Sequence, residues 1–197
     1  RSNNALDFDD LLLETALLMR EHADVRQRYR ERYLHLLVDE FQDTNMAQYE
    51  LVKQLVGPAR NLYCVADEDQ AIYAWRGADS RNIARLREDF PDMRQILLER
   101  NYRSTQMILD AANEVIKHNW QRTPKKLFTE SKGGPRVTVY QAYDEVEEAS
   151  FVVDEIARLA MQGLAEPGDC AILYRTNAQS RALEDAFVHR NLPYRLV

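Results

Sequence analysis

The feature that most constrains the fold is an alternation of short apolar runs with longer amphipathic stretches. Largely apolar runs occur at residues 34–38, 61–66 and 94–99, and a segment with helical spacing of apolar residues follows each of them. Short runs of this kind are typical of strands that are buried on both faces of a parallel sheet. Strand and helix in alternation favour a parallel sheet with helices packed on its faces. The sequence therefore predicts an α/β fold.

Amphipathic helices are expected over much of the remaining chain. Asp7 is placed to cap the first helix, and Asp144 with Glu147 three residues later resembles a capping box. The expected helices are 7–22, 24–32, 45–56, 80–89, 104–118, 145–162 and 179–190.

A polar, basic and turn-rich stretch at 119–135 predicts a long surface connection. A second alternation begins after it, with further strands expected at 135–143, 170–175 and 193–197, so that the chain ends inside a strand. The sequence is therefore interpreted as two α/β halves.

Composition limits the functions that are open to the chain. Its 197 residues carry a formal charge of -6, which argues against indiscriminate coating of nucleic acid but leaves room for a local basic channel. No apolar run approaches the roughly 18 residues that span a bilayer, and the first residues do not resemble a signal peptide, so a cytoplasmic location is expected. Cys64 and Cys170 lie in strand-like runs and are expected to be buried small hydrophobes rather than disulfide or metal ligands.

Two acidic residues, Asp39 and Glu40, follow the apolar run at 34–38. Ligands bind at the carboxyl ends of the strands in open parallel sheets. Asp39 is suited to hold Mg²⁺ while phosphate oxygens and waters fill the other positions, and Glu40 to activate a water for attack on a terminal phosphate. An isolated acid pair more often starts a loop or caps a helix, so this assignment depends on the neighbouring residues VDEFQDTN.

The second group of polar residues is VADEDQAIYAWRGAD at 65–79, again after an apolar run. Gln70 is an uncharged group that could detect a terminal phosphate, while Tyr73 and Trp75 offer ring faces on which bases could stack. Arg76 could add a phosphate or cation-π contact. Taken alone, two such aromatic residues are more often core residues, but the polar residues and glycine around them favour a loop.

The third group, LERNYRST at 98–105, lies at an expected strand-to-helix turn. Arg103 is a candidate arginine finger, because its guanidinium can stabilise negative charge that develops on a transferring phosphoryl group. The alternative is an ordinary surface arginine at the start of a helix.

Together these three motifs resemble those of superfamily-one DNA helicases of the UvrD, PcrA and Rep kind. VDEFQDTN agrees letter for letter with the second motif of that family, whereas the third motif departs from it at Ala66, where Gly is common, and Ala71, where Ser is common. Weaker matches at LDFDDLLL and at 171–187 extend the resemblance along nearly the whole chain.

The resemblance implies an ATP- and Mg²⁺-dependent helicase that moves 3′ to 5′ along single-stranded DNA and separates duplex at single-strand/double-strand junctions, in DNA repair or replication and with repair-protein partners. It implies RecA-like parallel sheets with flanking helices, of the P-loop NTPase type: residues 1–100 as the latter part of a first motor domain and 101–197 as the opening part of a second. In that family the arginine corresponding to Arg103 reaches the terminal phosphate, and the tyrosine corresponding to Tyr102 stacks near the adenine. Arg175 and Asn177 would contact the DNA backbone, although both are also ordinary turn residues.

The phosphate-cradling pattern G-x-x-x-x-G-K-[ST] does not occur in the sequence, because none of its six glycines begins such a run. The resemblance places that loop upstream of residue 1, so the chain is expected to be an internal fragment that alone neither binds ATP tightly nor hydrolyses it.

Three alternatives remain at this point. One is the motor portion of a helicase-nuclease of the AddA or RecB kind, which shares these motifs. Another is a two-metal phosphoesterase or nuclease. The last is a domain that only interacts with other molecules and has no motor activity. The acids available to a two-metal enzyme are Asp39, Glu40, Asp43, Asp67, Glu68 and Asp69.

Overall fold

The computed structural model describes residues 5–119, 122–131 and 133–197. The chain divides into two compact units, Arg1–Arg136 and Val137–Val197. The helices and strands of the first unit are α1 (Phe8–Glu21), α2 (Ala23–Arg32), β1 (Leu36–Val38), α3 (Met46–Leu55), β2 (Leu62–Cys64), α4 (Asn82–Asp89) and α5 (Gln106–Ile116), with 3-10 turns η1 (Phe41–Asp43), η2 (Glu68–Gln70) and η3 (Ala74–Arg76). The second unit holds α6 (Glu145–Met161), α7 (Ser180–His189) and the turns η4 (Pro167–Asp169) and η5 (Asn177–Gln179).

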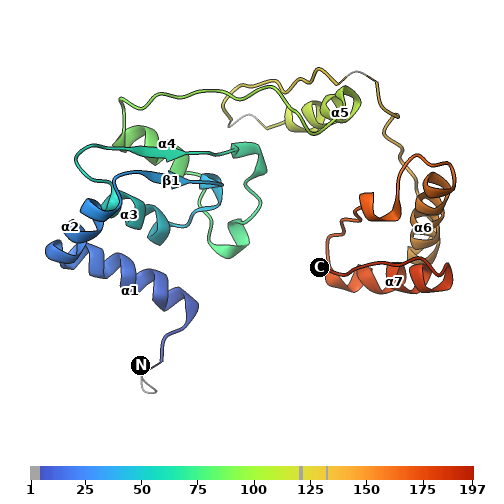
Figure 1. The fold of residues 1–197 in the computed structure, drawn as a ribbon, viewed down its shortest axis with the longest axis horizontal. Coiled ribbons are helices and arrows are strands. Elements are labelled where there is room, and N and C mark those ends of the chain that lie inside the picture. Colours follow the sequence, from blue (N-terminus) through green and yellow to red (C-terminus); the bar gives the residue numbers. More distant parts are fainter. Residues whose placement is uncertain (1–4, 120–121, 132) are drawn as a thin grey trace. The chain divides into compact units, whose positions relative to one another are not determined.

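The centre of the first unit is a parallel pair of strands, β1 and β2. Leu36 aligns with Leu62 and Val38 with Cys64, so both strands end at the same edge. Phe41, Tyr49, Ile83 and Leu86 form a buried cluster beside the strands, drawn from η1, α3 and α4. The strand pair thereby has helices packed against it, as the α/β prediction requires (Figure 1).

The helices begin where the sequence places their caps. Asp7 accepts a hydrogen bond from the Asp10 amide at 2.8 Å, and Asn45 accepts one from the Gln48 amide at 2.9 Å, each within a reciprocal capping box. Asp144 accepts from the Glu147 amide at 2.8 Å and confirms the predicted start of α6. The Glu147 carboxylate, however, accepts from the Tyr143 amide and not from the amide of the cap residue.

The expected strands at 94–99, 135–143, 170–175 and 193–197 are wrong for this structure, because among its described residues only β1 and β2 form strands. An isolated bridge joins Arg100, directly after the first of these segments, to Phe128, whose amide donates to the Glu99 carbonyl at 3.0 Å. The expected burial of 34–38 on both faces is also wrong, since the Leu37 side chain is 76% exposed. A strand is defined by the neighbour that pairs with its backbone, and an apolar pattern does not supply that neighbour.

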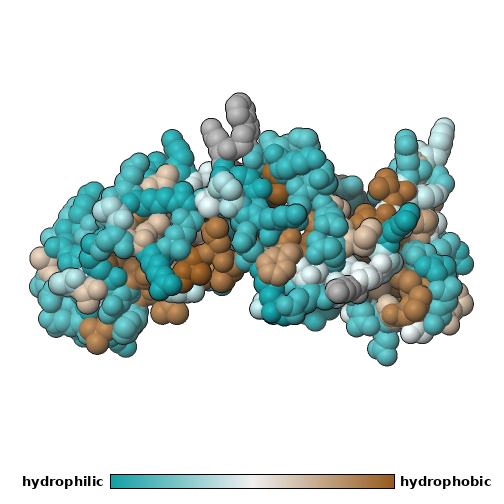
Figure 2. Space-filling model, turned by 90° about the horizontal axis from the view of Figure 1, so that it is seen from above, coloured by the Kyte–Doolittle hydropathy of each residue, from teal (hydrophilic) through white to brown (hydrophobic). Residues whose placement is uncertain are grey.

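Exposed apolar side chains accompany the unpaired segments. Figure 2 shows hydrophobic side chains, in brown, interrupting the mainly hydrophilic surface. None of the described helices is both long enough and apolar enough to cross a membrane. Cys64 and Cys170 are free and half-buried, and each packs against one of the two buried apolar clusters.

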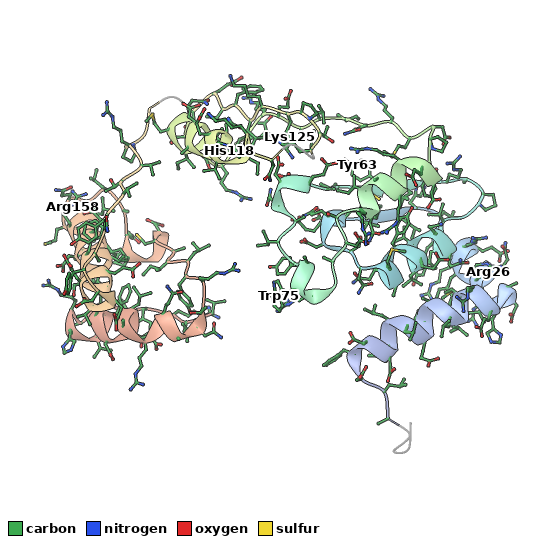
Figure 3. The ribbon with its side chains drawn as sticks, turned by 180° about the vertical axis from the view of Figure 1, so that it is seen from behind. Arg26, Tyr63, Trp75, His118, Lys125 and Arg158 are labelled. Carbon is green, nitrogen blue, oxygen red and sulfur yellow. The ribbon has the colours of Figure 1, made fainter. Side chains whose placement is uncertain are left out.

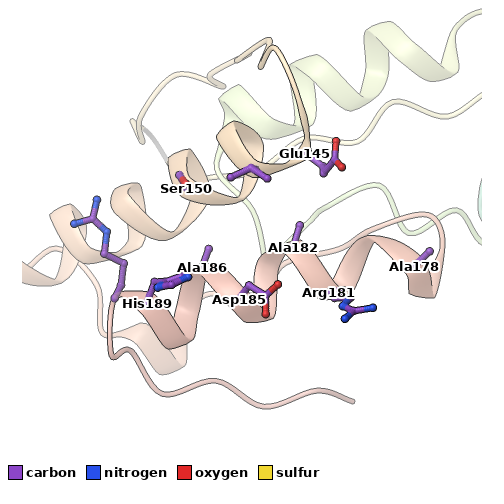
Figure 4. Close-up of a pocket in the computed structure, with 10 residues that line it drawn as sticks. Glu145, Ser150, Ala178, Arg181, Ala182, Asp185, Ala186 and His189 are labelled. Carbon is purple, nitrogen blue, oxygen red and sulfur yellow. The ribbon is translucent and has the colours of Figure 1, made fainter.

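The second unit is a helix pair. Val153 and Ile156 of α6 pack against Phe187 of α7. Side chains of both helices, including Glu145, Arg181 and Asp185, line a pocket of about 600 Å³ (Figure 4).

Candidate functional site

The acid pair lies where β1 ends. The Phe41 amide donates to the Val65 carbonyl at 2.9 Å and the Val65 amide donates to the Val38 carbonyl at 2.8 Å, so the chain leaving β1 is joined to the chain leaving β2. Glu40 has a left-handed backbone, with φ of 49°, and its amide donates to the Asp39 carboxylate at 2.9 Å. Both acidic side chains are exposed at this edge of the strand pair.

Gln42 connects this edge to the turn that follows β2. Its side chain is 1% exposed. Its amide nitrogen donates to Glu40 Oε2 at 2.6 Å, and its amide oxygen accepts from the Asp67 backbone amide at 2.9 Å. One buried amide thus fixes the Glu40 carboxylate relative to the backbone at residue 67.

Asp67 organises the turn η2. Its carboxylate accepts from the Asp69 amide at 3.0 Å and from Gln70 Nε2 at 2.6 Å, and it also accepts from the Lys125 ammonium group. Burial would raise the pKa of this carboxyl, but the hydrogen bonds from Lys125 and Gln70 outweigh it and hold the pKa below its ordinary value. Glu40 and Gln70 are therefore the two ends of one hydrogen-bonded chain that runs through Gln42 and Asp67.

The aromatic residues follow on the turn η3. The Trp75 side chain is 73% exposed and projects from the first unit (Figure 3). Its ring centroid lies 6.3 Å from that of Tyr73, and the Arg76 guanidinium lies 4.5 Å from the Trp75 centroid and 5.5 Å from the Tyr73 centroid. The group presents ring faces and a cation together, which suits contact with a base and a phosphate.

The aromatic turn is anchored to the end of the acidic motif. The Asp79 amide donates to the Thr44 carbonyl at 3.0 Å, and the fully buried Asn82 side chain donates to the same carbonyl at 2.9 Å. These bonds hold Asp79 and Asn82, which follow Trp75, against Thr44, which follows Glu40. This connection does not involve Gln42.

Arg103 and Tyr102 lie in the turn before α5. The Asn101 side chain accepts from the amides of Arg103 and Ser104, at 2.9 and 2.7 Å, and shapes this turn. Tyr102 is exposed, and the Arg100 guanidinium lies 4.8 Å from its ring centroid. Within the described residues no hydrogen bond or ion pair joins Arg103 to Glu40 or Gln70, so the structure brings together the acid and the amide but not the guanidinium.

Arg175 and Asn177 belong to the second unit. The Gln179 side chain accepts from the Arg175 amide at 3.0 Å and from the Thr176 amide at 2.9 Å, which stabilises the turn before α7. Both predicted contact residues are exposed there.

Of the six acids, Asp39 and Glu40 are exposed, Asp67, Glu68 and Asp69 are paired with basic side chains, and Asp43 has a buried Oδ1 without a hydrogen-bond partner among the described residues. Asp39 keeps an exposed carboxylate at the strand edge, which fits a single-carboxylate Mg²⁺ ligand of the kind found with nucleotides. Asp67 contacts Lys125, Glu68 contacts Arg87, and Asp69 contacts Arg122. No group of three His, Cys, Asp or Glu side chains that could hold a metal ion occurs in the part of the chain that the structure describes.

Gln42 and Asn82 were assigned no role from the sequence, and Asp67 was considered only as an acid available to a two-metal enzyme. The one sequence signal at Gln42 is its position, because it is a polar residue between Phe41 and Asp43 shortly after a strand. Its partner Asp67 is 25 residues away along the chain. Asn82 is fully buried, and its partner Thr44 is 38 residues away. Partners so distant along the chain are visible only in the folded structure.

The chain matches two helicase domain families in succession. Residues 1–91 match the UvrD/REP helicase N-terminal domain, and residues 96–197 match the UvrD-like helicase C-terminal domain. The chain therefore belongs to the UvrD-like helicases, and the resemblance inferred from its motifs is confirmed.

The similar curated proteins include helicases named PcrA. The ATP-dependent DNA helicase PcrA of Staphylococcus epidermidis is 50% identical over 195 residues, which are 99% of this chain and 27% of that protein. PcrA of Staphylococcus aureus is 49% identical over 195 residues, with the same coverage of 99% and 27%. The chain thus spans about a quarter of the length of these relatives.

Proposed function

We propose that this chain is the part of an ATP-dependent DNA helicase that links nucleotide hydrolysis to a grip on single-stranded DNA. The complete enzyme would use ATP and Mg²⁺, move 3′ to 5′ and unwind duplex at single-strand/double-strand junctions, in the cytoplasm and in DNA repair or replication. Residues 1–100 would belong to a first RecA-like motor domain and residues 101–197 to a second. Family membership and the relatives named PcrA support this assignment.

The observation that carries the proposal is the hydrogen-bonded chain from Glu40 through Gln42 and Asp67 to Gln70. A carboxylate that activates water and an amide that detects the terminal phosphate must respond to the same event. A chain of short hydrogen bonds keeps the two groups in a fixed relation. Three residues beyond Gln70, the aromatic turn begins, so a shift at the amide would reach Tyr73 and Trp75 over a short stretch of backbone.

Each predicted site residue then has a defined task. Asp39 would hold Mg²⁺, which when bound neutralises phosphate charge and orients the leaving group. Glu40 would orient the attacking water and accept its proton, and Gln70 would bond the terminal phosphate only while it is present. Arg103 would stabilise charge on the transferred phosphoryl group, with Tyr102 against the adenine.

DNA would be held by stacking and by charge. Bases would stack on Tyr73 and Trp75, with Arg76 at a phosphate. Arg175 and Asn177 would contact the DNA backbone. Stacking without hydrogen bonds to base edges suits a motor that moves along any sequence.

The test is Glu40→Gln in the full-length enzyme. DNA-stimulated ATP hydrolysis should fall by about 100-fold or more, because general-base catalysis contributes roughly two to four orders of magnitude. Affinity for ATP and for single-stranded DNA should change little, since glutamine preserves the shape of the side chain. The proposal is wrong if the variant hydrolyses ATP at the normal rate.

A further inference from the structure

A basic segment after α5 lies against the turn η2. We call Arg122, Thr123 and Lys125 the basic clasp, and Asp67, Glu68 and Asp69 the acidic turn. The Lys125 ammonium contacts Asp67 and lies 3.2 Å from Asp69 Oδ2, and Arg122 Nη2 lies 2.7 Å from that same oxygen. The Thr123 amide donates to Glu68 Oε2 at 2.7 Å. Each of the three acids of the turn therefore has a partner in the basic clasp.

The clasp is not an ordinary set of surface ion pairs. The side chains of Lys125 and Arg122 are 16% and 15% exposed, and that of Asp69 is 11% exposed. The predicted long surface connection at 119–135 is thus held at this point by partly buried charges. Exposed ion pairs contribute little to the free energy of folding. Removing one partner of a buried pair leaves an uncompensated charge and changes the local structure.

Asp67 joins the clasp to the nucleotide-sensing side chain. Its Oδ1 accepts from Lys125 and its Oδ2 accepts from Gln70 Nε2. The ammonium therefore fixes the rotation of the carboxylate, and the carboxylate fixes the direction of the Gln70 amide. Figure 3 shows Lys125 on the segment that follows α5, which is far along the sequence from η2.

We propose that Lys125 is a positioning residue that orients Gln70 through Asp67, so that the segment flanking α5 acts on the phosphate sensor. The inference rests on the proposed function. It assigns a role to a residue outside all three motifs. The turn that carries Arg103 lies before α5, and the basic clasp follows α5. One end of the helix therefore leads to a candidate phosphate-contacting arginine, and the other end leads to Lys125, which supports Gln70 through Asp67.

The experiment compares Lys125→Met, Lys125→Arg and the matched control Lys126→Met in the full-length enzyme. Lys126 is the adjacent lysine and is exposed, and the structure gives its ammonium no partner among the described residues. Lys125→Met should lower the maximal DNA-stimulated rate of ATP hydrolysis about tenfold, while the KM for ATP and the affinity for single-stranded DNA stay within about threefold. Lys126→Met should match the wild type, and Lys125→Arg should recover most of the rate because it keeps the charge.

A double variant separates positioning from general stability. Gln70→Ala alone should lower the stimulated rate, and adding Lys125→Met should lower it by less than about twofold more, because residues that act through one another are not additive. Full additivity, or a normal rate for Lys125→Met, would overturn the inference.

Hydrogen exchange in the 197-residue chain distinguishes failure of this inference from failure of the proposed function. Lys125→Met should accelerate exchange of the Gln70 and Ala71 amides about tenfold, and Lys126→Met should not. If that acceleration occurs but the wild-type full-length enzyme shows no DNA-stimulated hydrolysis, the proposed function has failed and the positioning role falls with it. Unchanged exchange would refute the clasp itself.

Discussion

Gln42 illustrates how a single buried amide can serve a site without touching the reacting atoms. Its nitrogen bonds the Glu40 carboxylate and its oxygen bonds the Asp67 amide. Both groups can be satisfied by one side chain because an amide has a donor end and an acceptor end. A glutamate or a leucine would satisfy at most one of them.

Gln42→Leu should therefore destabilise the chain. Leucine has a similar volume, but it leaves the Asp67 amide and one Glu40 oxygen without their partner, at a cost of about 1–3 kcal/mol. Urea unfolding of the 197-residue chain followed by circular dichroism measures the change. As a control, Gln27→Leu removes an exposed glutamine whose amide bonds Glu31, and it should cost less than about 0.5 kcal/mol. Equal midpoints for the two variants would show that the Gln42 bonds contribute nothing.

At the level of elements, helices and strands differed in how far the sequence could predict them. The predictions of α1 and α3 succeeded because Asp7 and Asn45 cap helices whose apolar periodicity is local. The strand expected at 170–175 failed, since its pattern does not specify a pairing partner and none occurs among the described residues. Glu40 and Gln70 were selected as candidate site residues because each follows a strand-like run. Lys125 and Asp67 lie 58 residues apart, so their contact could not be predicted without the fold.

The turn η3 allows a test of the DNA contact. In the full-length enzyme, Trp75→Ala should weaken binding of single-stranded DNA about 5- to 150-fold, because stacking contributes roughly 1–3 kcal/mol per base. The folded structure should survive, as the ring is exposed. Fluorescence anisotropy of labelled oligonucleotides measures the affinity, and Trp75→Phe, which retains a stacking face, should recover most of it. Unaltered affinity in the alanine variant would mean that the ring does not contact DNA.

For the whole molecule, the decisive feature is which parts of an ATPase it contains. The chain has the acid pair, the proposed sensing amide Gln70 and the candidate arginine Arg103, but no G-x-x-x-x-G-K-[ST] run. Backbone amides and a lysine from such a loop hold the phosphates in P-loop enzymes. All of these candidate residues lie in the first compact unit, and on the proposed function they would act on a nucleotide held by a loop outside this chain.

We accordingly predict that the purified 197-residue chain neither binds ATP tightly nor hydrolyses it, with or without single-stranded DNA. Calorimetric titration with ATP and Mg²⁺, together with a phosphate-release assay, measures both properties. A DNA-stimulated rate that disappears in Glu40→Gln would contradict the prediction, because it would show a working site within these residues.

If Glu40 is the catalytic base proposed above, its left-handed backbone sets stability against activity. Left-handed φ values cost a residue with a side chain roughly 1–2 kcal/mol more than they cost glycine. On the proposed function, the Glu40 carboxylate would be required at a position whose backbone conformation favours glycine. Variants selected only for resistance to denaturation would therefore accumulate glycine at this position, and only selection for catalysis would keep the glutamate.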